Sequence, residues 1–392
     1  ADEQLKQDIA NYVDEVWEDV VTDIDRLVRI ESVEDLEHAE PGSPWGPGPH
    51  KALREACDIA AELGLEATDC DGYIGYADLP GTSDRQLAMI AHSDIVPLGT
   101  GWTVDPLKVT RKDGYLMGRG VIDDKGPLVL MLYAAHYFAR AGKPLPYTIR
   151  CIIGSNEETS MGDVEWYLEH QPQPAFLFTP DADFPLCYGE KGGYSCIVTS
   201  AELGEDRRIV DFTGGTVGNA IPNLAEATVV ADASALPAAE RIEVSDAGDG
   251  GTLRTVDGRF EQTLDSRYPT AITGEKITET ITELASRYHA TVECDLDMVP
   301  FVTDPKSAAI RTLIDTYNEV TGNSDEPFTM GGGTYARHFE RAASFGPNDP
   351  HVTNPDWVHG EHSADEGVSE DLMRRALGIY ILSIARLMEQ EL

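Results

Sequence analysis

The sequence predicts an α/β protein in which a domain with a largely parallel, mixed sheet flanked by helices carries an inserted α+β domain. Three observations predict this fold. Short apolar runs alternate with helical patterns in the first half of the chain, as in layered α/β proteins. Between residues 194 and 299 the pattern changes to strand-like runs. The helix and strand alternation then returns from Asp304 to Leu392.

The N-terminal third of the chain begins with helical patterns. Residues 3–35 carry apolar side chains at helical spacing, among them Ile9 and Val13, and predict one or two amphipathic helices. The Gly/Pro-rich stretch 40–49 predicts a loop, and residues 50–63 predict a further helix.

Three apolar runs predict buried strands, at residues 86–92, 147–154 and 175–179. Residues 126–142, between the first two runs, predict a helix. Because parallel strands need long crossover connections, this order favours a largely parallel sheet.

The middle of the chain predicts the inserted domain. Expected strands lie at residues 194–200, 208–212, 225–233, 241–245, 259–268 and 290–297, with a helix at 274–288. We therefore predict a discontinuous catalytic domain, 1–193 plus 300–392, and an inserted lid domain over 194–299.

Composition excludes several classes of protein. The formal net charge is −39, so the surface repels phosphate backbones and nucleic acid is a poor partner. This acidity is explained either by salt adaptation or, as we favour, by high solubility alone. No apolar stretch approaches the roughly 20 residues that span a bilayer, so we expect no membrane partner. The first residues do not resemble a signal peptide.

The six cysteines are scattered and form no Cys-x-x-Cys pair. Such thiols in a long chain favour a reducing compartment over a disulfide framework. We therefore expect a cytoplasmic protein.

Five short segments place acids or histidines after a predicted strand or in a Gly/Pro loop. They are His92-Ser93-Asp94, Asp123-Asp124, Glu157-Glu158, Asp181 and the stretch His359–Glu366. Taken singly, each has a common alternative: a surface histidine, a helix N-cap or a solvated acidic pair. Together they predict one site, because α/β sheets place their sites at the carboxyl ends of strands.

The residue types suit a metal. Histidine and carboxylate ligands favour zinc, with manganese or cobalt possible. Side chains two residues apart share one face of an extended chain, so Asp94 is placed to accept the second ring N–H of His92. Adjacent Glu157 and Glu158 point to different sides, which allows one to bind metal while the other faces a bound water.

Seven strings resemble, in this order, the aminoacylase/carboxypeptidase-like family of two-zinc metallopeptidases, and within it the PepV-type bacterial dipeptidase branch. The strings are AHSDIVPLGTGW, GRGVIDDKGP, SNEETSMGD, FTPDADFPLCYGEKGG, LDSRYP, GGGTYAR and HSADEG, between Ala91 and Gly367.

The resemblance implies a ligand set. His92 and Asp181 would bind one zinc, Glu158 and His362 the other, and Asp123 would bridge them. It also implies that the Asp123–Asp124 peptide bond is cis. His359 is the rival of His362, which we prefer because the family string continues with Asp365-Glu366.

The resemblance further implies cleavage of the peptide bond of dipeptides or another small amide. A hydroxide bridging two Zn²⁺ ions would attack, with Glu157 as general base and Asp94 orienting His92. Positions matching substrate contacts are Asn219, Arg267, Gly331, Gly332, Gly333 and Thr334. The alternatives are an N-acyl-amino-acid deacylase, a carboxypeptidase, or a non-catalytic binding protein on this fold. The expected assembly is a monomer or a homodimer.

The chain departs from the family pattern in the lid. No histidine occurs between Gly193 and His289, although relatives take an oxyanion-stabilising histidine from this domain. The lid is also short for this family, and we expect that its central segment is missing. Either it is truly truncated or residues are omitted near Gly258 and Arg259. We favour omission, because the flanking strands are intact.

Overall fold

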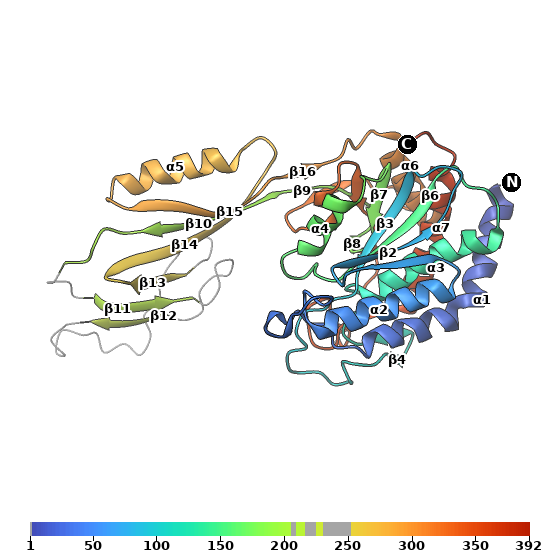
Figure 1. Cartoon of the computed structure of the whole chain (residues 1–392), viewed down its shortest axis with the longest axis horizontal. Coiled ribbons are helices and arrows are strands. Elements are labelled where there is room, and N and C mark those ends of the chain that lie inside the picture. The colour runs from blue at the N-terminus through green and yellow to red at the C-terminus, as the bar shows by residue number, and fades with distance from the viewer. Residues whose placement is uncertain (1, 205–208, 216–224, 230–251) are drawn as a thin grey trace. The chain divides into compact units, whose positions relative to one another are not determined.

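The chain is described by a computed structural model at residues 2–204, 209–215, 225–229 and 252–392. It divides into two compact units (Figure 1). Unit 1 comprises Ala1–Gly189 and Thr303–Leu392, and unit 2 comprises Glu190–Val302. These boundaries differ by a few residues from those expected from the sequence. Within the described ranges, no helix has both the length and the apolarity needed to cross a membrane.

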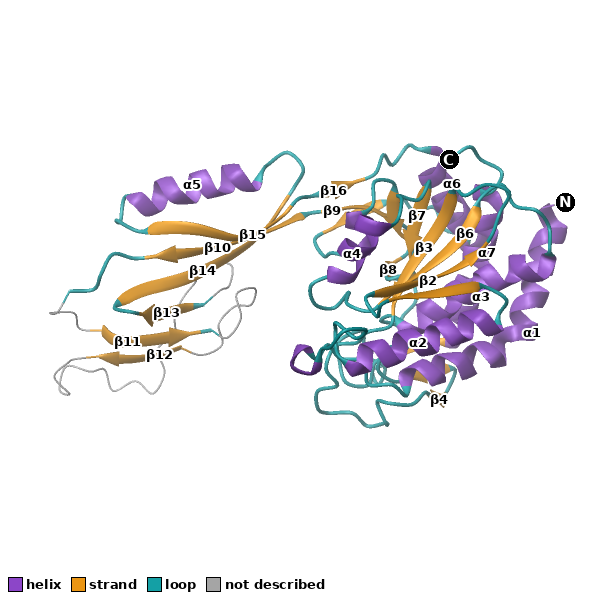
Figure 2. Ribbon diagram, viewed as in Figure 1, coloured by secondary structure: helices purple, strands orange, loops and turns teal. Residues whose placement is uncertain are grey.

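Unit 1 is built on a mixed sheet, which confirms the predicted α/β class (Figure 2). Its strands, in spatial order, are β1 (Glu66–Cys70), β2 (Ile74–Leu79), β6 (Thr148–Gly154), β3 (Gln86–His92), β7 (Phe176–Thr179), β18 (Ala342–Ser344) and β9 (Cys187–Glu190), with β17 (Phe328–Met330) on β9. β6, β3, β7 and β18 are parallel, whereas β1, β2 and β9 pair antiparallel with their neighbours.

Helices cover this sheet. They are α1 (Asp2–Val28), α2 (Pro47–Glu62), α3 (Lys125–Ala141), α4 (Gly162–His170), α6 (Ala308–Thr321) and α7 (Glu370–Leu387). α1, α3 and α7 pack against one another, α6 packs on α7, and α2 lies on β1 and β2. Every residue of α3 from Lys125 to Ala135 is buried, as expected of a helix that is apolar on all sides.

The central strands are fully covered. Every residue of β3, β6 and β7 is buried, which explains why these segments read as continuous apolar runs. The register pairs His92 with Gly154, so the carboxyl ends of β3 and β6 lie side by side. The polar segments that follow these strands therefore emerge at one edge of the sheet.

Short elements complete unit 1. They are the 3-10 helices η1 (Leu36–His38) and η3 (Tyr335–His338), the small sheet of β4 (Thr110–Lys112), β5 (Tyr115–Met117) and β20 (Gly367–Ser369), and the pair β8 (Ala182–Asp183) with β19 (Pro347–Asn348). β20 pairs with β5, which brings the chain after His362 beside the chain before Asp123.

In its described residues, unit 2 consists of an antiparallel sheet and one helix. The sheet order is β12 (Ala225–Val229), β11 (Ile209–Gly214), β13 (Leu253–Val256), β14 (Arg259–Tyr268), β10 (Gly192–Thr199) and β15 (Thr291–Met298). α5 (Gly274–Ser286) packs on β10 and β15, and β16 (Phe301–Val302) precedes the return to unit 1. Tyr194, Cys196 and Tyr268 form its small core.

The inserted segment contains a tight hairpin at residues 253–268. β13 and β14 are joined by the two-residue turn Asp257–Gly258, with Val256 paired to Arg259. Both turn residues have positive φ, 49° and 75°, as in the hairpin turns that favour Asp-Gly. A tight hairpin joins Gly258 to Arg259 in this structure, and the expected omission of residues near Gly258/Arg259 stays a prediction. The strand expected at 241–245 lies outside the described residues.

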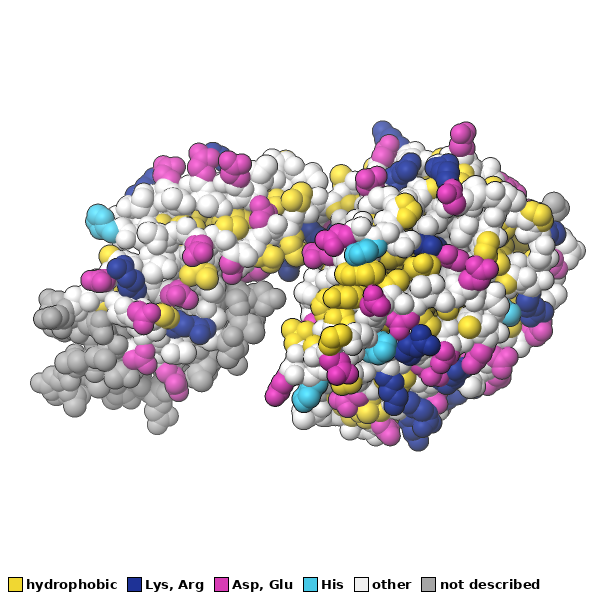
Figure 3. Space-filling view, viewed as in Figure 1, with side chains coloured by type: hydrophobic (Ala, Val, Ile, Leu, Met, Phe, Trp, Pro, Cys, Tyr) yellow, Lys and Arg dark blue, Asp and Glu magenta, His cyan; other side chains and the backbone are white. Residues whose placement is uncertain are grey.

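The acidic side chains visible in Figure 3 are dispersed. On the face shown in Figure 3, carboxylates are scattered over each unit and do not gather in one patch. This distribution suits a solvated surface more than a single cation-binding face.

Candidate metal centre

The carboxyl-terminal edge of the parallel strands gathers the acids and histidines of the five sequence segments. His92 is the last residue of β3 and is fully buried. Glu157 and Glu158 lie on the loop after β6, and Asp181 lies two residues beyond β7. Asp123 lies on the loop before α3, and its peptide bond to Asp124 is cis.

A first group joins His92, Asp123 and Asp181. The Nε2 atom of His92 lies 3.1 Å from Oδ1 of Asp123 and 3.3 Å from Oδ2 of Asp181. A second group joins Asp123, Glu158 and His362. The Nε2 atom of His362 lies 2.9 Å from Oδ2 of Asp123 and 3.2 Å from Oε2 of Glu158. Asp123 thus presents one oxygen to each group.

Of the two histidines in the segment 359–362, His362 belongs to this cluster. His362 has a positive φ of 65° and its side chain is 55% exposed. His359 points elsewhere, because its Nδ1 lies 2.8 Å from the main-chain oxygen of Ala364. Among the described residues, the groups able to hold a metal include His362 and not His359.

The donor atoms fit divalent cations. Ligand atoms about 2.0–2.2 Å from a tetrahedral ion lie roughly 3.4 Å from one another. In each of the two groups the candidate ligand atoms all lie within 4.8 Å of one another. Nitrogen and carboxylate oxygen are the donors that zinc accepts, and manganese or cobalt accept them as well.

The pKa shifts of the clustered carboxylates also indicate a cation site. Burial raises the pKa of Asp181 to about 6 and that of Glu158 to about 8. Burial also raises the pKa of Glu157 well above its usual value, and the nearby Asp181 adds to the effect. For Asp123, burial is outweighed by the two histidines, His362 first, and the pKa is lowered. Bound cations would relieve this crowding of buried carboxylates.

Asp94 contacts three residues of the cluster: the ring of His92 and the backbone N–H groups of Glu157 and Glu158. His92 places Nδ1 2.9 Å from the main-chain oxygen of Asp94 and 3.2 Å from its carboxylate Oδ1. Since the main-chain oxygen can only accept, Nδ1 carries the proton and Nε2 keeps its lone pair for a metal. The Asp94 carboxylate also accepts the backbone N–H groups of Glu157, at 3.1 Å, and Glu158, at 3.0 Å. The sequence suggested only the contact with His92.

Two further features were missed from the sequence. Asp124 begins α3, yet its carboxylate accepts the backbone N–H of His92 at 3.1 Å instead of capping the helix. Tyr335 packs edge-on against His92, with ring centroids 6.2 Å apart, and donates its hydroxyl hydrogen to buried Asp163. A Cβ at Gly154 would lie 2.1 Å from that hydroxyl oxygen, so the end of β6 has no room for a side chain.

Glu366 and Arg119 form a third feature that the sequence reading did not assign. Both side chains are buried and form an ion pair of 3.0 Å. Burial raises the pKa of Glu366 to about 7, and the nearby Asp123 carboxylate adds to the effect. The signal for both residues was present only as their place inside the strings GRGVIDDKGP and HSADEG.

The expected substrate contacts lie on segments other than the strand ends that carry the cluster. Gly331, Gly332 and Gly333 form a partly exposed loop directly before Thr334 and Tyr335. The hydroxyl of Thr334 accepts the N–H of Ala336 and so caps η3. Arg267 lies exposed on β14 of unit 2. Asn219 lies outside the described residues.

Residues 88–386 match the model of a family described as Peptidase family M20/M25/M40. YtjP of Bacillus subtilis (strain 168), whose name gives it a provisional dipeptidase role, is 27% identical, and the alignment covers 94% of this chain and 97% of YtjP. The Beta-Ala-Xaa dipeptidase of Lactobacillus delbrueckii subsp. lactis is 33% identical over 213 residues, 54% of this chain and 45% of that protein.

The alignment with YtjP runs over 463 positions, 71 more than the 392 residues of this chain, so YtjP has at least that many positions without a counterpart here. Solved structures share the fold. Human carnosine dipeptidase 1 has a TM-score of 0.69 at 16% identity, covering 98% of this chain and 99% of its own. The Bacillus subtilis YXEP protein, described as a dinuclear metal binding peptidase, has a TM-score of 0.55 at 12% identity over 94% and 99%.

Proposed function

Because this chain belongs to peptidase family M20/M25/M40, we propose that it is a two-metal dipeptidase that hydrolyses the peptide bond of unblocked dipeptides. The observation that carries the proposal is the shared carboxylate of Asp123, which faces His92 with one oxygen and His362 with the other. Relatives named as dipeptidases support this substrate class.

Each ion would have its own ligands in addition to Asp123. His92 and Asp181 would hold one, and Glu158 and His362 the other; zinc suits both sets. When bound, such ions lower the pKa of a coordinated water from 15.7 to about 7 and polarise the carbonyl of the scissile bond.

Glu157 would move the proton in this reaction. Its Oε2 lies 3.4 Å from Nε2 of His92, whereas Oε2 of Glu158 lies 3.2 Å from Nε2 of His362. The bond from its backbone N–H to Asp94 fixes the residue at this position. Glu157 would take a proton from the attacking water and later deliver it to the leaving amine, as general base and then general acid.

The glycine loop before Tyr335 suits the substrate carboxylate. A Cβ at Gly331 or Gly332 would meet nothing within 4 Å, so the loop borders open space. Tyr335 links the loop to His92. Backbone N–H groups in such a loop can bind an anion. Arg267 is the proposed donor to the developing oxyanion, because unit 2 offers no histidine besides His289.

The test combines metal removal with a substitution. Excess chelator should abolish dipeptide hydrolysis, and zinc, cobalt or manganese should restore it. Glu157→Gln should keep both metals and lose about 10²–10⁴-fold in turnover. Glu165→Gln, at an exposed glutamate of α4, is the matched control and should turn over as the unsubstituted protein does.

Three results would contradict the proposal. Full activity of a metal-free protein in chelator would remove the metals from the mechanism. Unchanged turnover by Glu157→Gln would remove Glu157 from its role. Cleavage of N-acyl amino acids without cleavage of dipeptides would make the protein a deacylase.

A further inference from the structure

A buried ion pair lies behind the metal ligands and joins the two chain segments that carry Asp123 and His362. Arg119 and Glu366 have side-chain exposures of 2% and 0%, and Nη1 of Arg119 lies 3.0 Å from Oε1 of Glu366. Neither residue is among the groups able to hold a metal in the described part of the chain. The pair is therefore distinct from the candidate ligands, and it touches them through the backbone N–H of Asp123.

The second oxygen of Glu366 holds the Asp123 loop. Oε2 accepts backbone N–H groups from Gly120 at 2.9 Å, Ile122 at 3.1 Å and Asp123 at 3.3 Å. One carboxylate oxygen thus fixes the main chain up to and including the shared ligand. The backbone N–H of Gly118 donates to the main-chain oxygen of Glu366 at 3.0 Å, which adds a backbone contact between the same segments.

The guanidinium of Arg119 holds the His362 segment. Nη1 donates to the main-chain oxygen of Ser363, the residue after His362, at 3.0 Å. Nη2 donates to the main-chain oxygens of Pro97 and Leu98, each at 3.1 Å. A planar guanidinium can reach these three acceptors and a carboxylate at once because its donors form a fixed fork.

The two ligand groups are supported differently. His92 is part of β3 and Asp181 follows β7, so the sheet itself fixes them. His362 lies on a loop, more than half exposed, at a residue with positive φ. Its position relative to Asp123 depends on the contacts between the two segments. The β5–β20 pairing supplies main-chain contacts, and the Arg119–Glu366 pair supplies the buried side-chain contacts next to the two ligands.

We propose that Arg119 and Glu366 are positioning residues that set the metal affinity of the Asp123–Glu158–His362 group more than that of the His92–Asp123–Asp181 group. The inference rests on the two-metal function proposed above. Asp123 is common to both groups, but the first group keeps two ligands on the sheet when the loop shifts.

The experiment measures metal binding, not activity. Metal-free protein is titrated with Zn²⁺ or Co²⁺ against a competing chelator, for the unsubstituted chain, Glu366→Gln and Arg119→Lys. Glu366→Gln keeps the shape but turns an amide donor toward the N–H groups or toward Arg119. Arg119→Lys keeps the charge but cannot satisfy four acceptors with one ammonium.

The matched control is Asp78→Asn. Asp78 forms an ion pair of 2.8 Å with Arg150, with side-chain exposures of 17% and 8%, and it touches none of the candidate ligands. It tests whether breaking any half-buried ion pair of unit 1 weakens metal binding. Circular dichroism checks that each variant is folded.

We expect the unsubstituted protein to bind two ions. In Glu366→Gln and Arg119→Lys one dissociation constant should rise about 10–100-fold, the usual cost of losing a group that orients a metal ligand. The other should change less than about threefold, and Asp78→Asn should change neither. If Glu366→Gln does not fold, Arg119→Lys decides.

Two outcomes overturn the inference while the two-metal function stands: both variants bind two ions as tightly as the unsubstituted protein, or Asp78→Asn shows the same loss. Failure of the unsubstituted protein to bind two ions would instead overturn the proposed function.

Discussion

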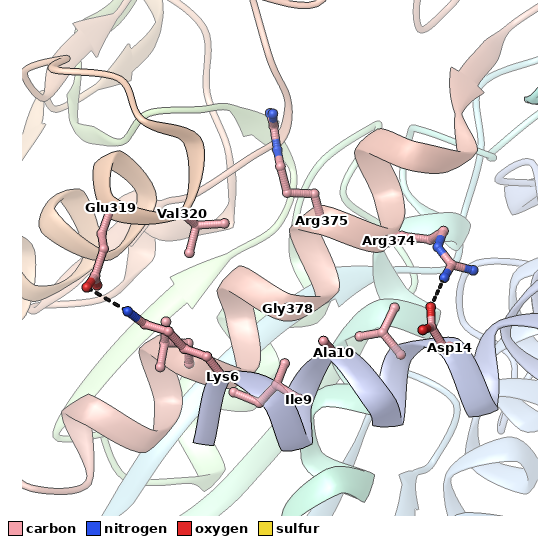
Figure 4. A pocket seen from close by; sticks show the side chains of 11 residues that line it. Lys6, Ile9, Ala10, Asp14, Glu319, Val320, Arg374, Arg375 and Gly378 are labelled. Carbon is pink, nitrogen blue, oxygen red and sulfur yellow. Dashed lines mark hydrogen bonds and ion pairs between the residues drawn. The ribbon is translucent and has the colours of Figure 1, made fainter. Parts of the chain in front are cut away.

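Replacing Gly378 by alanine should stabilise unit 1. Gly378 is in the middle of α7 and lines a pocket of about 480 Å³ between α1, α6 and α7 (Figure 4). A Cβ built there would have one neighbour within 4 Å, the Cγ2 of Ile9 at 3.8 Å, an ordinary van der Waals contact. The new methyl group therefore fits without any movement of its surroundings.

The magnitude follows from two contributions. Glycine in a helix interior is about 0.8–1.0 kcal/mol less favourable than alanine. Full burial of a methyl-sized group adds up to roughly 0.8 kcal/mol, and Gly378 is only half-buried, so less than that applies. We expect Gly378→Ala to raise the free energy of unfolding by about 1–1.5 kcal/mol.

Gly126→Ala is the matched control, because Gly126 also lies in a helix, the first turn of α3. There a Cβ would lie 1.9 Å from the main-chain oxygen of Val121, which cannot move aside cheaply. The same substitution should therefore lower the free energy of unfolding by about 1–3 kcal/mol. The general preference of helices for alanine would raise the free energy of unfolding in both variants. A decrease in Gly126→Ala alone would therefore report the steric clash of its Cβ.

Urea unfolding followed by tryptophan fluorescence measures this effect in unit 1 alone. All five tryptophans belong to that unit: Trp17, Trp45, Trp102, Trp166 and Trp357. A shifted midpoint at unchanged slope reports stability. A lower midpoint for Gly378→Ala, or a higher one for Gly126→Ala, would refute the reasoning from free space.

Two further predictions concern Asp94 and His338. Asp94→Asn should lower metal affinity or kcat/KM about 10–100-fold, because an amide cannot accept both N–H groups of Glu157 and Glu158; unchanged values in chelator titration and kinetics would speak against it. Burial, with Arg337 adding to it, lowers the pKa of His338 to about 4. Its contribution is therefore present above pH 6.5, the value of the unfolded chain, and is lost as the pH falls toward 4. Between pH 7 and 4, urea midpoints should show His338→Gln losing roughly 2 kcal/mol less stability than the unsubstituted protein; parallel losses would contradict the prediction.

Much of the fold could be predicted because the sheet of unit 1 is covered on both faces. The run at residues 86–92 is apolar from Leu87 to Ala91, and the structure places β3 at the same residues 86–92. The helix expected at 126–142 is α3, whose first eleven residues are all buried. The N-terminal pattern, expected to form one or two helices, is the single helix α1. In these segments local pattern and tertiary environment agree.

The sequence was enough to predict which residues form the cluster. It was not enough to predict the hydrogen bonds and ion pairs that hold them in place. The carboxyl ends of neighbouring parallel strands must meet at one edge, so His92 and the Glu157–Glu158 pair follow from strand order. The contacts of Asp94 with two backbone N–H groups follow only from the path of a loop. The Arg119–Glu366 pair joins residues 247 positions apart, and no local pattern records that contact.

The two parts of unit 1 are separated in sequence by unit 2, so the ribosome synthesises them at different times. β18 lies inside the sheet, between β7 and β9, yet it is encoded after the whole inserted unit. Domains generally fold as units while synthesis proceeds from the N-terminus. During translation the sheet therefore lacks β18 until Ser344 has been synthesised. His362 is synthesised later still. A nascent chain of this protein therefore lacks one residue of the candidate metal centre, His362, until synthesis has passed the inserted unit and β18.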